Sequence, residues 1–158
     1  MSDNPYAPPA ATSDPSGTPP RRGSALLAVA IGWVTDIVGT TIFSAVAILC
    51  IGIMLGADGA TDGELAALEQ SSGWRAFGLV FGMGFTALGG YVTARIANYS
   101  EYRLAALMGL SSLVTGEILI QMGEPESSLF WVRLVGFVFT LPAALGGAWW
   151  YLQRKHSS

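Results

Sequence analysis

The sequence predicts an all-α polytopic membrane protein, a bundle of four transmembrane helices with both ends of the chain in the cytoplasm. Hydrophobic residues make up 51% of the 158-residue chain and charged residues only 12%, against about 25% charged residues in a typical soluble domain. Four apolar stretches each reach the roughly 20 residues that a helix needs to cross the hydrocarbon core of a bilayer. Basic residues concentrate at one end of these stretches, which sets the orientation.

The chain divides into three parts. Residues 1–23 hold most of the prolines, mixed with Ser, Thr, Gly and Asp, and have no apolar periodicity, so we expect a disordered cytoplasmic tail. The membrane domain covers residues 24–153, and residues 154–158 are expected to form a basic cytoplasmic tail. Within the membrane domain the sequence predicts helices at 25–56, 74–97, 104–122 and 129–152, with an outer loop at 57–73.

The first apolar stretch and the outer loop each carry a local signal. The run 25–56 is far longer than the apolar region of a cleaved signal peptide, so we expect a retained helix that tilts or begins in the interface. In the outer loop, Glu64 follows Thr61 at a distance of three residues. This spacing is that of a capping box and predicts a short amphipathic helix on the outer surface.

The orientation follows from the basic residues, because cytoplasmic loops carry an excess of Lys and Arg. Only Arg75 and Arg133 flank the outer side, which also carries most of the acidic residues. The basic residues on the other side are Arg21, Arg22, Arg95, Arg103, Arg154 and Lys155. Both termini are therefore predicted to lie inside.

Small residues recur at helical spacing and predict close packing between helices, because association in lipid depends on close backbone approach. The positions that we expect at helix contacts are Gly78, Gly82, Gly90, Gly109, Gly116, Gly136 and Gly147. Packing within one bundle and a dimerisation face are both compatible with this pattern. The segment Ala-Leu-Gly-Gly at 87–90 recurs at 144–147, an offset of 57 residues, which suggests that the second and fourth helices are alike.

Two acidic residues fall within the predicted helices, where a charge is costly and suggests a function. Glu117 lies about 9 Å below the outer end of the third helix, at a depth similar to that of Arg133. It either forms an ion pair with Arg133 or serves as a proton or cation site. Asp36 is either interfacial, paired with Arg95, or the start of a polar face in the first helix.

Several classes of function have no support in the residues. Gly109 and Ser111 match the GxS of rhomboid-type proteases, but no histidine falls within a predicted helix, and a single membrane aspartate cannot form an aspartyl protease pair. We therefore predict no catalytic residues, and we predict no enzyme. No metal-ligand cluster, dinucleotide fingerprint or phosphate-binding loop occurs, so no metal or other cofactor is expected. The net charge of −3 gives no basic footprint for nucleic acid.

The stretch from Ala87 to Gly116 carries a resemblance. It contains GGY-x-x-AR at the end of the second helix and AAL-x-G at the start of the third. In this it resembles a loose group of small four-helix bacterial membrane proteins of unknown function. The resemblance implies a multi-pass protein of the bacterial inner membrane and implies no activity.

The sequence leaves two classes of function open. We expect a structural or accessory membrane component, whose partners are the lipid bilayer and either a second copy of itself or another membrane protein. The alternative is a small homo-oligomeric proton-coupled transporter or channel that uses Glu117, Asp36 or both. It would be similar in outline to small multidrug resistance proteins, but their essential glutamate lies in the first helix, where this chain has Asp36.

Overall fold

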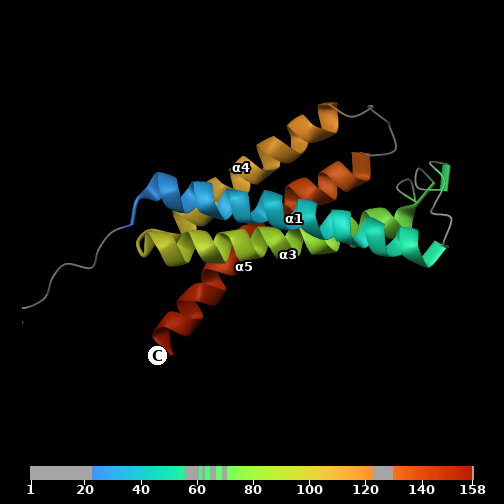
Figure 1. Cartoon of the computed structure of the whole chain (residues 1–158). Coiled ribbons are helices and arrows are strands. Elements are labelled where there is room, and N and C mark those ends of the chain that lie inside the picture. The colour runs from blue at the N-terminus through green and yellow to red at the C-terminus, as the bar shows by residue number, and fades with distance from the viewer. Residues whose placement is uncertain are drawn as a thin grey trace, which may run out of the picture.

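The computed structural model describes residues 23–55, 61, 63–64, 67–68, 71–122 and 130–157, and these are helical apart from short turns. The helices are α1 (Ala25–Leu55), α3 (Ser72–Ala97), α4 (Glu101–Met122) and α5 (Phe130–His156), as Figure 1 shows. The predicted all-α class is confirmed for this part of the chain. Apart from Gly23, the predicted N-terminal tail lies outside the described residues, as does much of the outer loop.

Three of the helices are long and apolar enough to cross a membrane, by length and composition: Ala25–Met54, Ser72–Ala97 and Arg133–His156. The helix α4 is not among them. Its sequence includes Glu101, Arg103 and Glu117 together with several hydroxyl side chains. The described structure thus supports a membrane protein with three candidate spans.

The ends of α3 differ little from the prediction and have clear capping groups. The helix begins two residues earlier than expected, because the Ser71 hydroxyl accepts a hydrogen bond of 3.2 Å from the Trp74 backbone N–H. It ends at Ala97, as predicted. Asn98 follows in the left-handed conformation at φ 53°, and its N–H bonds to the Ala94 carbonyl.

The other two helices of the second half are longer than predicted. The helix α4 starts three residues early, with Glu101 in its first turn, where a negative charge stabilises the exposed N–H groups. The helix α5 continues to His156 and takes in most of the residues that we expected in a basic tail. Arg154, Lys155 and His156 occupy its last turn, where positive charge interacts favourably with the free carbonyl groups.

The four helices form two hairpins that cross. Helix α3 packs against the other three helices, and α4 also contacts α1 and α5, whereas α1 and α5 do not pack against each other within the described residues. Figure 1 shows α1 and α3 side by side, with α4 and α5 running obliquely across them. We call the end that holds the α3–α4 turn the Lys155 end, and the opposite end the Arg133 end.

The repeated Ala-Leu-Gly-Gly segments meet each other at the crossing of α3 and α5. A methyl group at Gly90 would overlap the Ala144 carbonyl, and one at Gly147 would overlap the Ala87 carbonyl. Ala87 and Gly90 correspond to Ala144 and Gly147 in the repeat, so the contact is reciprocal. The resemblance between the two segments therefore has a structural basis, an approximately two-fold crossing at which the two backbones touch.

The α1–α3 pair uses two kinds of contact along its length. Near the Lys155 end, Gly32 faces Gly89 and Thr93 so closely that no side chain would fit at residue 32. Farther along, the Phe43 ring stacks on Phe81 with a centroid separation of 4.3 Å. Small residues bring the backbones together at one end, and aromatic rings fill a wider gap toward the other.

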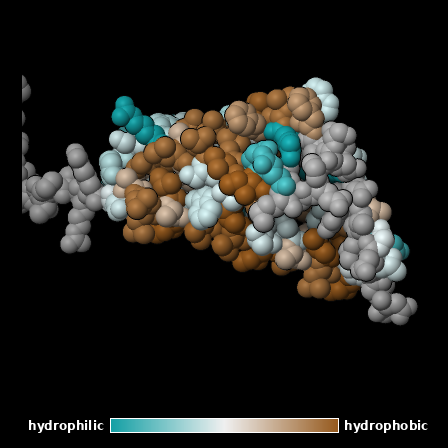
Figure 2. Space-filling view, turned by 90° about the horizontal axis from the view of Figure 1, so that it is seen from above, coloured by the Kyte–Doolittle hydropathy of each residue, from teal (hydrophilic) through white to brown (hydrophobic). Residues whose placement is uncertain are grey.

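The buried core is small and lies toward the Lys155 end. Its buried apolar residues are Ala28, Ala94, Ala97, Leu104, Ala105, Met108, Ala144 and Ala148. Many large apolar side chains instead face outward, among them Leu26 at 81% exposure and Trp131 at 70%. Figure 2 shows brown side chains over most of the face in view. Such an apolar exterior fits a lipid environment better than water.

Candidate functional site in the bundle interior

The carboxylate of Asp36 lies inside the bundle, three turns into α1, with only 5% of the residue exposed. It is positioned by the close Gly32–Gly89 contact one turn away, which turns this face of α1 toward α3. The Thr86 hydroxyl on α3 lies 3.1 Å from Asp36 Oδ1 and bonds to it. The residue is therefore buried between the helices.

Thr86 has two acceptors for one proton. Its hydroxyl oxygen lies 3.1 Å from the Asp36 carboxylate and 3.0 Å from the Gly82 carbonyl. A hydroxyl donates a single hydrogen bond and accepts others through its lone pairs. When the Thr86 hydroxyl donates its proton to the Gly82 carbonyl, its oxygen can accept a hydrogen bond from Asp36. Asp36 must then be protonated to donate that bond. The arrangement thus accommodates both the charged and the neutral form of the acid.

Ser112 on α4 completes the surroundings of Asp36. The residue is 8% exposed, and its hydroxyl makes no hydrogen bond within the described part of the chain. It lines the same cavity as Asp36. A buried hydroxyl without a partner is uncommon in folded proteins. Rotation of this group would supply a second polar contact to Asp36 or to a ligand.

The structure does not bring Asp36 and Arg95 together. Arg95 is exposed near the end of α3, more than two turns from the level of Thr86. No ion pair involves Asp36 among the residues that the structure describes. These residues also contain no group of three or more His, Cys, Asp or Glu side chains placed to hold a metal ion. Within the described part of the chain, no cation offsets the cost of burying this carboxylate.

A cavity of about 290 Å³ adjoins Asp36. Its wall is made of hydroxyl side chains, glycines and a few apolar side chains from all four helices. The polar residues lining it are Asp36, Thr40, Thr41, Thr86, Ser112 and Thr140, and the glycines are Gly78, Gly82, Gly116 and Gly136. The cavity lies where the two hairpins have begun to separate beyond their crossing.

The glycines that the sequence predicts at helix contacts fall into two groups. Gly90, Gly109 and Gly147 lie against neighbouring helices, as the pattern predicts. A methyl group at Gly78, Gly82, Gly116 or Gly136 would instead find no atom of another element within 4 Å. Close packing within the chain is therefore not observed for these four, because the hairpins diverge on the Arg133 side of the crossing. They line the cavity.

A second cavity, of about 530 Å³, lies between α4 and α5 and shares Ser112, Gly116, Gly136 and Thr140 with the first. Glu117 and Arg133 both line it. Arg133 Nη1 is 3.8 Å from Glu117 Oε1, and the Gln121 amide donates a 3.1 Å hydrogen bond to the same oxygen. The two charged residues that the sequence placed at similar depth therefore lie together.

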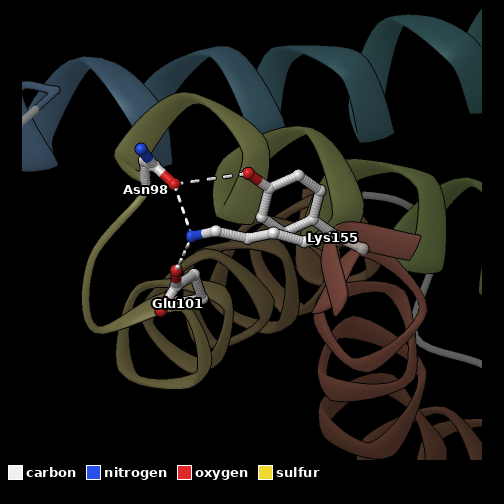
Figure 3. Close-up of polar contacts among 4 residues, drawn as sticks. Asn98, Glu101 and Lys155 are labelled. Carbon is white, nitrogen blue, oxygen red and sulfur yellow. Dashed lines mark hydrogen bonds and ion pairs between the residues drawn. The ribbon is translucent and has the colours of Figure 1, made fainter. Parts of the chain in front are cut away.

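A separate polar cluster joins the helices at the Lys155 end. It consists of Asn98, Glu101, Tyr151 and Lys155 (Figure 3). Lys155 Nζ donates to Asn98 Oδ1 at 2.6 Å and to Glu101 Oε1 at 3.4 Å. The Tyr151 hydroxyl lies 3.4 Å from the same Asn98 oxygen. The last turn of α5 is thus joined to the α3–α4 turn, and the bundle is closed at this end.

Sequence reasoning found Asp36 but not its partners. Thr86 and Ser112 stand at helical spacing among the glycines and alanines of α3 and α4, a pattern that predicts small packing groups. The available signal was that each is the hydroxyl residue among glycines and alanines at helical spacing. Which of these faces meets Asp36 depends on the helix contacts and not on the sequence spacing.

Comparison with known proteins identifies no relative. No protein-family model matches the chain, and neither a curated protein nor a solved structure matches it.

Proposed function

We propose that the chain is a multi-pass protein of a bacterial cytoplasmic membrane, with four spans and both termini inside. The charge distribution supports this orientation. As a 22-residue helix, α4 spans about 33 Å at 1.5 Å per residue, enough for a bilayer core. One of its polar side chains is bonded within the bundle, since Thr115 accepts a 3.1 Å hydrogen bond from the Trp33 indole. Its exposed side chains Leu107, Leu110, Val114 and Leu119 are apolar.

Cysteine labelling in intact cells tests this topology. In a Cys50→Ser background, Ser72→Cys at the start of α3 should react with a membrane-impermeant maleimide, and Ser157→Cys after α5 should not. If α4 does not cross, the end of α5 moves to the outer side and Ser157→Cys becomes reactive. Labelling after cell lysis controls for buried thiols, because both positions should then react.

For the activity, we propose a small proton-linked transporter for a cationic solute, with Asp36 as the group that binds the proton and the cation in turn. The observation that carries this proposal is a 5% exposed carboxylate that adjoins a cavity and has no cationic partner among the described residues. A buried carboxylate requires neutralisation, because an isolated charge in an apolar medium is strongly unfavourable. Either a proton or a bound cation can neutralise the Asp36 carboxylate, and the two cannot bind to it at the same time.

The surroundings of Asp36 support the exchange. Thr86 is able to bond to either form of the acid, since its proton can go to Asp36 or to Gly82. Ser112 and Thr140 supply further oxygen atoms in the wall of the cavity. The cavity adjoins the 530 Å³ cavity between α4 and α5, which lies in the size range of organic ligand sites.

Proton release on cation binding tests this function directly. Purified protein in a weakly buffered detergent solution is mixed with Na⁺, guanidinium or tetraethylammonium, and the displaced protons are followed with a pH dye. We expect at least one of these cations to release close to one proton per chain from the wild type and none from Asp36→Asn. Glu101→Gln is the matched control and should behave as the wild type. Equal release from wild type and Asp36→Asn, or none with all three cations, would overturn the proposal.

The structural or accessory function is the second candidate, and the closed Lys155 end favours it. Lys155, Asn98 and Glu101 hold α5 to the α3–α4 turn, and the helices touch at Gly90 and Gly147. A bundle joined in this way suits a rigid membrane component. Co-purification of a stoichiometric membrane partner together with no cation-linked proton release would favour this role over transport.

A further inference from the structure

The guanidinium group of Arg133 is incompletely satisfied in the cavity between α4 and α5. Its Nε atom is buried and has no hydrogen-bond partner among the described residues. Its Nη1 atom is 3.8 Å from Glu117 Oε1, whereas a charge-assisted hydrogen bond between such groups is about 2.7–2.9 Å long. Arg133 and Glu117 therefore lie next to each other without forming a tight pair, and the arginine retains an unused donor.

The two charges sit at the mouth of the cavity and not in its depth. Arg133 is in the first turn of α5, and Glu117 is little more than one turn from the end of α4. The lining residues Ser112 and Thr140 lie about 10 Å deeper, since seven residues separate Arg133 from Thr140 along α5. In a membrane, this places the charges near the headgroup level and the inner end within the hydrocarbon region.

Below the charges the wall of the cavity is apolar. Five of its lining side chains are hydrocarbon or aromatic: Leu79, Leu113, Val114, Ile118 and Phe137. Val114, Ile118 and Phe137 are also more than half exposed, so the cavity opens sideways between α4 and α5 toward the surrounding medium. The cavity thus combines a charged mouth with an apolar interior and lateral access.

We propose that this cavity binds one phospholipid whose headgroup carries a phosphate and a primary ammonium, with the phosphate on Arg133, the ammonium beside Glu117 and an acyl chain along the apolar wall. An arginine offers several N–H donors in a geometry that suits phosphate oxygens, and the Arg133 side chain is partly exposed. The partly exposed Glu117 accepts hydrogen bonds from an ammonium group. The opposite charges of the mouth match a zwitterionic headgroup, and neither charge is left without a partner.

This site is distinct from the carboxylate of Asp36 and does not depend on the transport proposal. Asp36 does not line the α4–α5 cavity, and Arg133 and Glu117 do not line the Asp36 cavity. A lipid chain in the former would, however, cover Ser112, Gly136 and Thr140, which both cavities share. Loss of lipid binding is consequently expected in Arg133→Gln, and loss of proton release is expected in Asp36→Asn, so the two proposals fail separately.

Native mass spectrometry of the full chain tests the proposal. Protein stripped of lipid in detergent is incubated with mixed micelles that contain phosphatidylethanolamine or phosphatidylcholine, and retained lipid is counted per chain. We expect one retained phosphatidylethanolamine in the wild type, and a loss of retention by about tenfold or more in Arg133→Gln, since a hydrogen bond to a charged group is worth about that factor. Arg95→Gln, an exposed arginine on α3, is the control and should retain lipid as the wild type does.

Two further variants separate the parts of the site. Glu117→Gln should keep phospholipid but lose the preference for phosphatidylethanolamine over phosphatidylcholine, whose quaternary ammonium has no N–H to donate. Val114→Trp should fill the apolar wall and reduce binding of both lipids while leaving the charges in place. Circular dichroism verifies that each variant folds. Unchanged retention in both Arg133→Gln and Val114→Trp would overturn the proposal, as would displacement of the lipid by inorganic phosphate alone.

Discussion

Gly90 on α3 lies directly against the backbone carbonyl of Ala144 on α5, and the equivalent residues of the repeat, Gly147 and Ala87, meet in the same way. This crossing determines where the two hairpins touch and where they separate. On the Lys155 side of it lies most of the buried core. On the Arg133 side, the glycines of the same stripe line cavities. The position of Asp36 follows from this division, because it faces the first space beyond the contact.

The crossing predicts a contrast between two adjacent glycines of α5. Gly147→Ala should destabilise the protein by about 1–3 kcal/mol, because the added methyl would overlap the Ala87 carbonyl and the backbones would have to move apart. Gly146→Ala adds the same methyl where no atom of another described helix lies within 4 Å. It should be neutral or stabilise by up to about 1 kcal/mol through helix propensity. Reversible unfolding in mixed micelles measures both.

The same comparison is available on α3. Gly90→Ala should cost a similar amount to Gly147→Ala, and Gly84→Ala should behave as Gly146→Ala does, since Gly84 also has no neighbour within 4 Å. Equal stabilities for the members of each pair would contradict the close backbone contact.

The hydrogen bond between Thr86 and Asp36 predicts a loss of stability in Thr86→Val. This variant keeps the shape of the side chain but leaves the buried Asp36 without its bonded hydroxyl, at a cost of about 1–3 kcal/mol. Thr35→Val is the matched control on α1, since the Thr35 hydroxyl bonds to the Ile31 carbonyl of its own helix. It should change stability by less than about 0.5 kcal/mol.

A double-mutant cycle with Asp36→Ala, which removes the acceptor, isolates this interaction. If Thr86→Val costs as much in the Asp36→Ala background as in the wild type, the hydroxyl acts through the Gly82 carbonyl alone, and the assigned bond to Asp36 is not the stabilising one.

Asn98 predicts a difference between two small substitutions at the end of α3. The residue adopts a left-handed conformation at φ 53° and also accepts the 2.6 Å hydrogen bond from Lys155. Asn98→Ala should lose both the conformational preference and the bond, for a cost of about 1–2 kcal/mol. Asn98→Gly loses only the bond and should cost about 0.2–1 kcal/mol, as exposed charged contacts do.

Salt separates the two contributions at Asn98. The Lys155 interactions should weaken in concentrated NaCl, because exposed charges are screened, whereas the cost of the left-handed conformation should not change. The stability difference between Asn98→Ala and Asn98→Gly is therefore expected to persist in salt. A difference that disappears in salt would assign the whole effect to Lys155.

The helices were predictable because their signals are local. Apolar runs, the Ser71 cap and the charges of the terminal turns all act within a few residues, and the observed limits differ from the expected ones by four residues at most. The nearness of Glu117 and Arg133 is also nearly local, because the two residues flank one connection between consecutive helices. Neither of these depends on how the hairpins cross.

The surroundings of Asp36 could not be predicted because they depend on tertiary contacts. The sequence offered Arg95 as its partner from charge and approximate depth. The face of α1 is instead set by the Gly32–Gly89 contact, which directs Asp36 toward Thr86 while Arg95 remains exposed. The glycine pattern was likewise ambiguous, because a glycine that allows close packing and a glycine that lines a cavity are identical in sequence.

The capping box of the loop between α1 and α3 predicts a pH dependence. The Thr61 backbone N–H and its hydroxyl each lie 2.9 Å from Glu64 Oε2, and the Glu64 N–H lies 3.3 Å from the Thr61 hydroxyl, which confirms the predicted motif. The bond from the backbone N–H, and after it the bond from the hydroxyl, lowers the pKa of Glu64. Because the pKa is lowered on folding, the contribution to stability is present above the ordinary value of 4.5 and is lost as the pH falls below it.

The titration of Glu64, followed by carbon-detected NMR of its side-chain carboxyl in nanodiscs, tests this ordering. Thr61→Val removes the hydroxyl and keeps the N–H, so the pKa of Glu64 should rise part of the way to its ordinary value. Thr61→Pro removes both donors and should raise it further, because the backbone bond is the larger cause. A full return to the ordinary value in Thr61→Val would reverse the order of the two causes, and no difference among the three proteins would contradict the capping box itself.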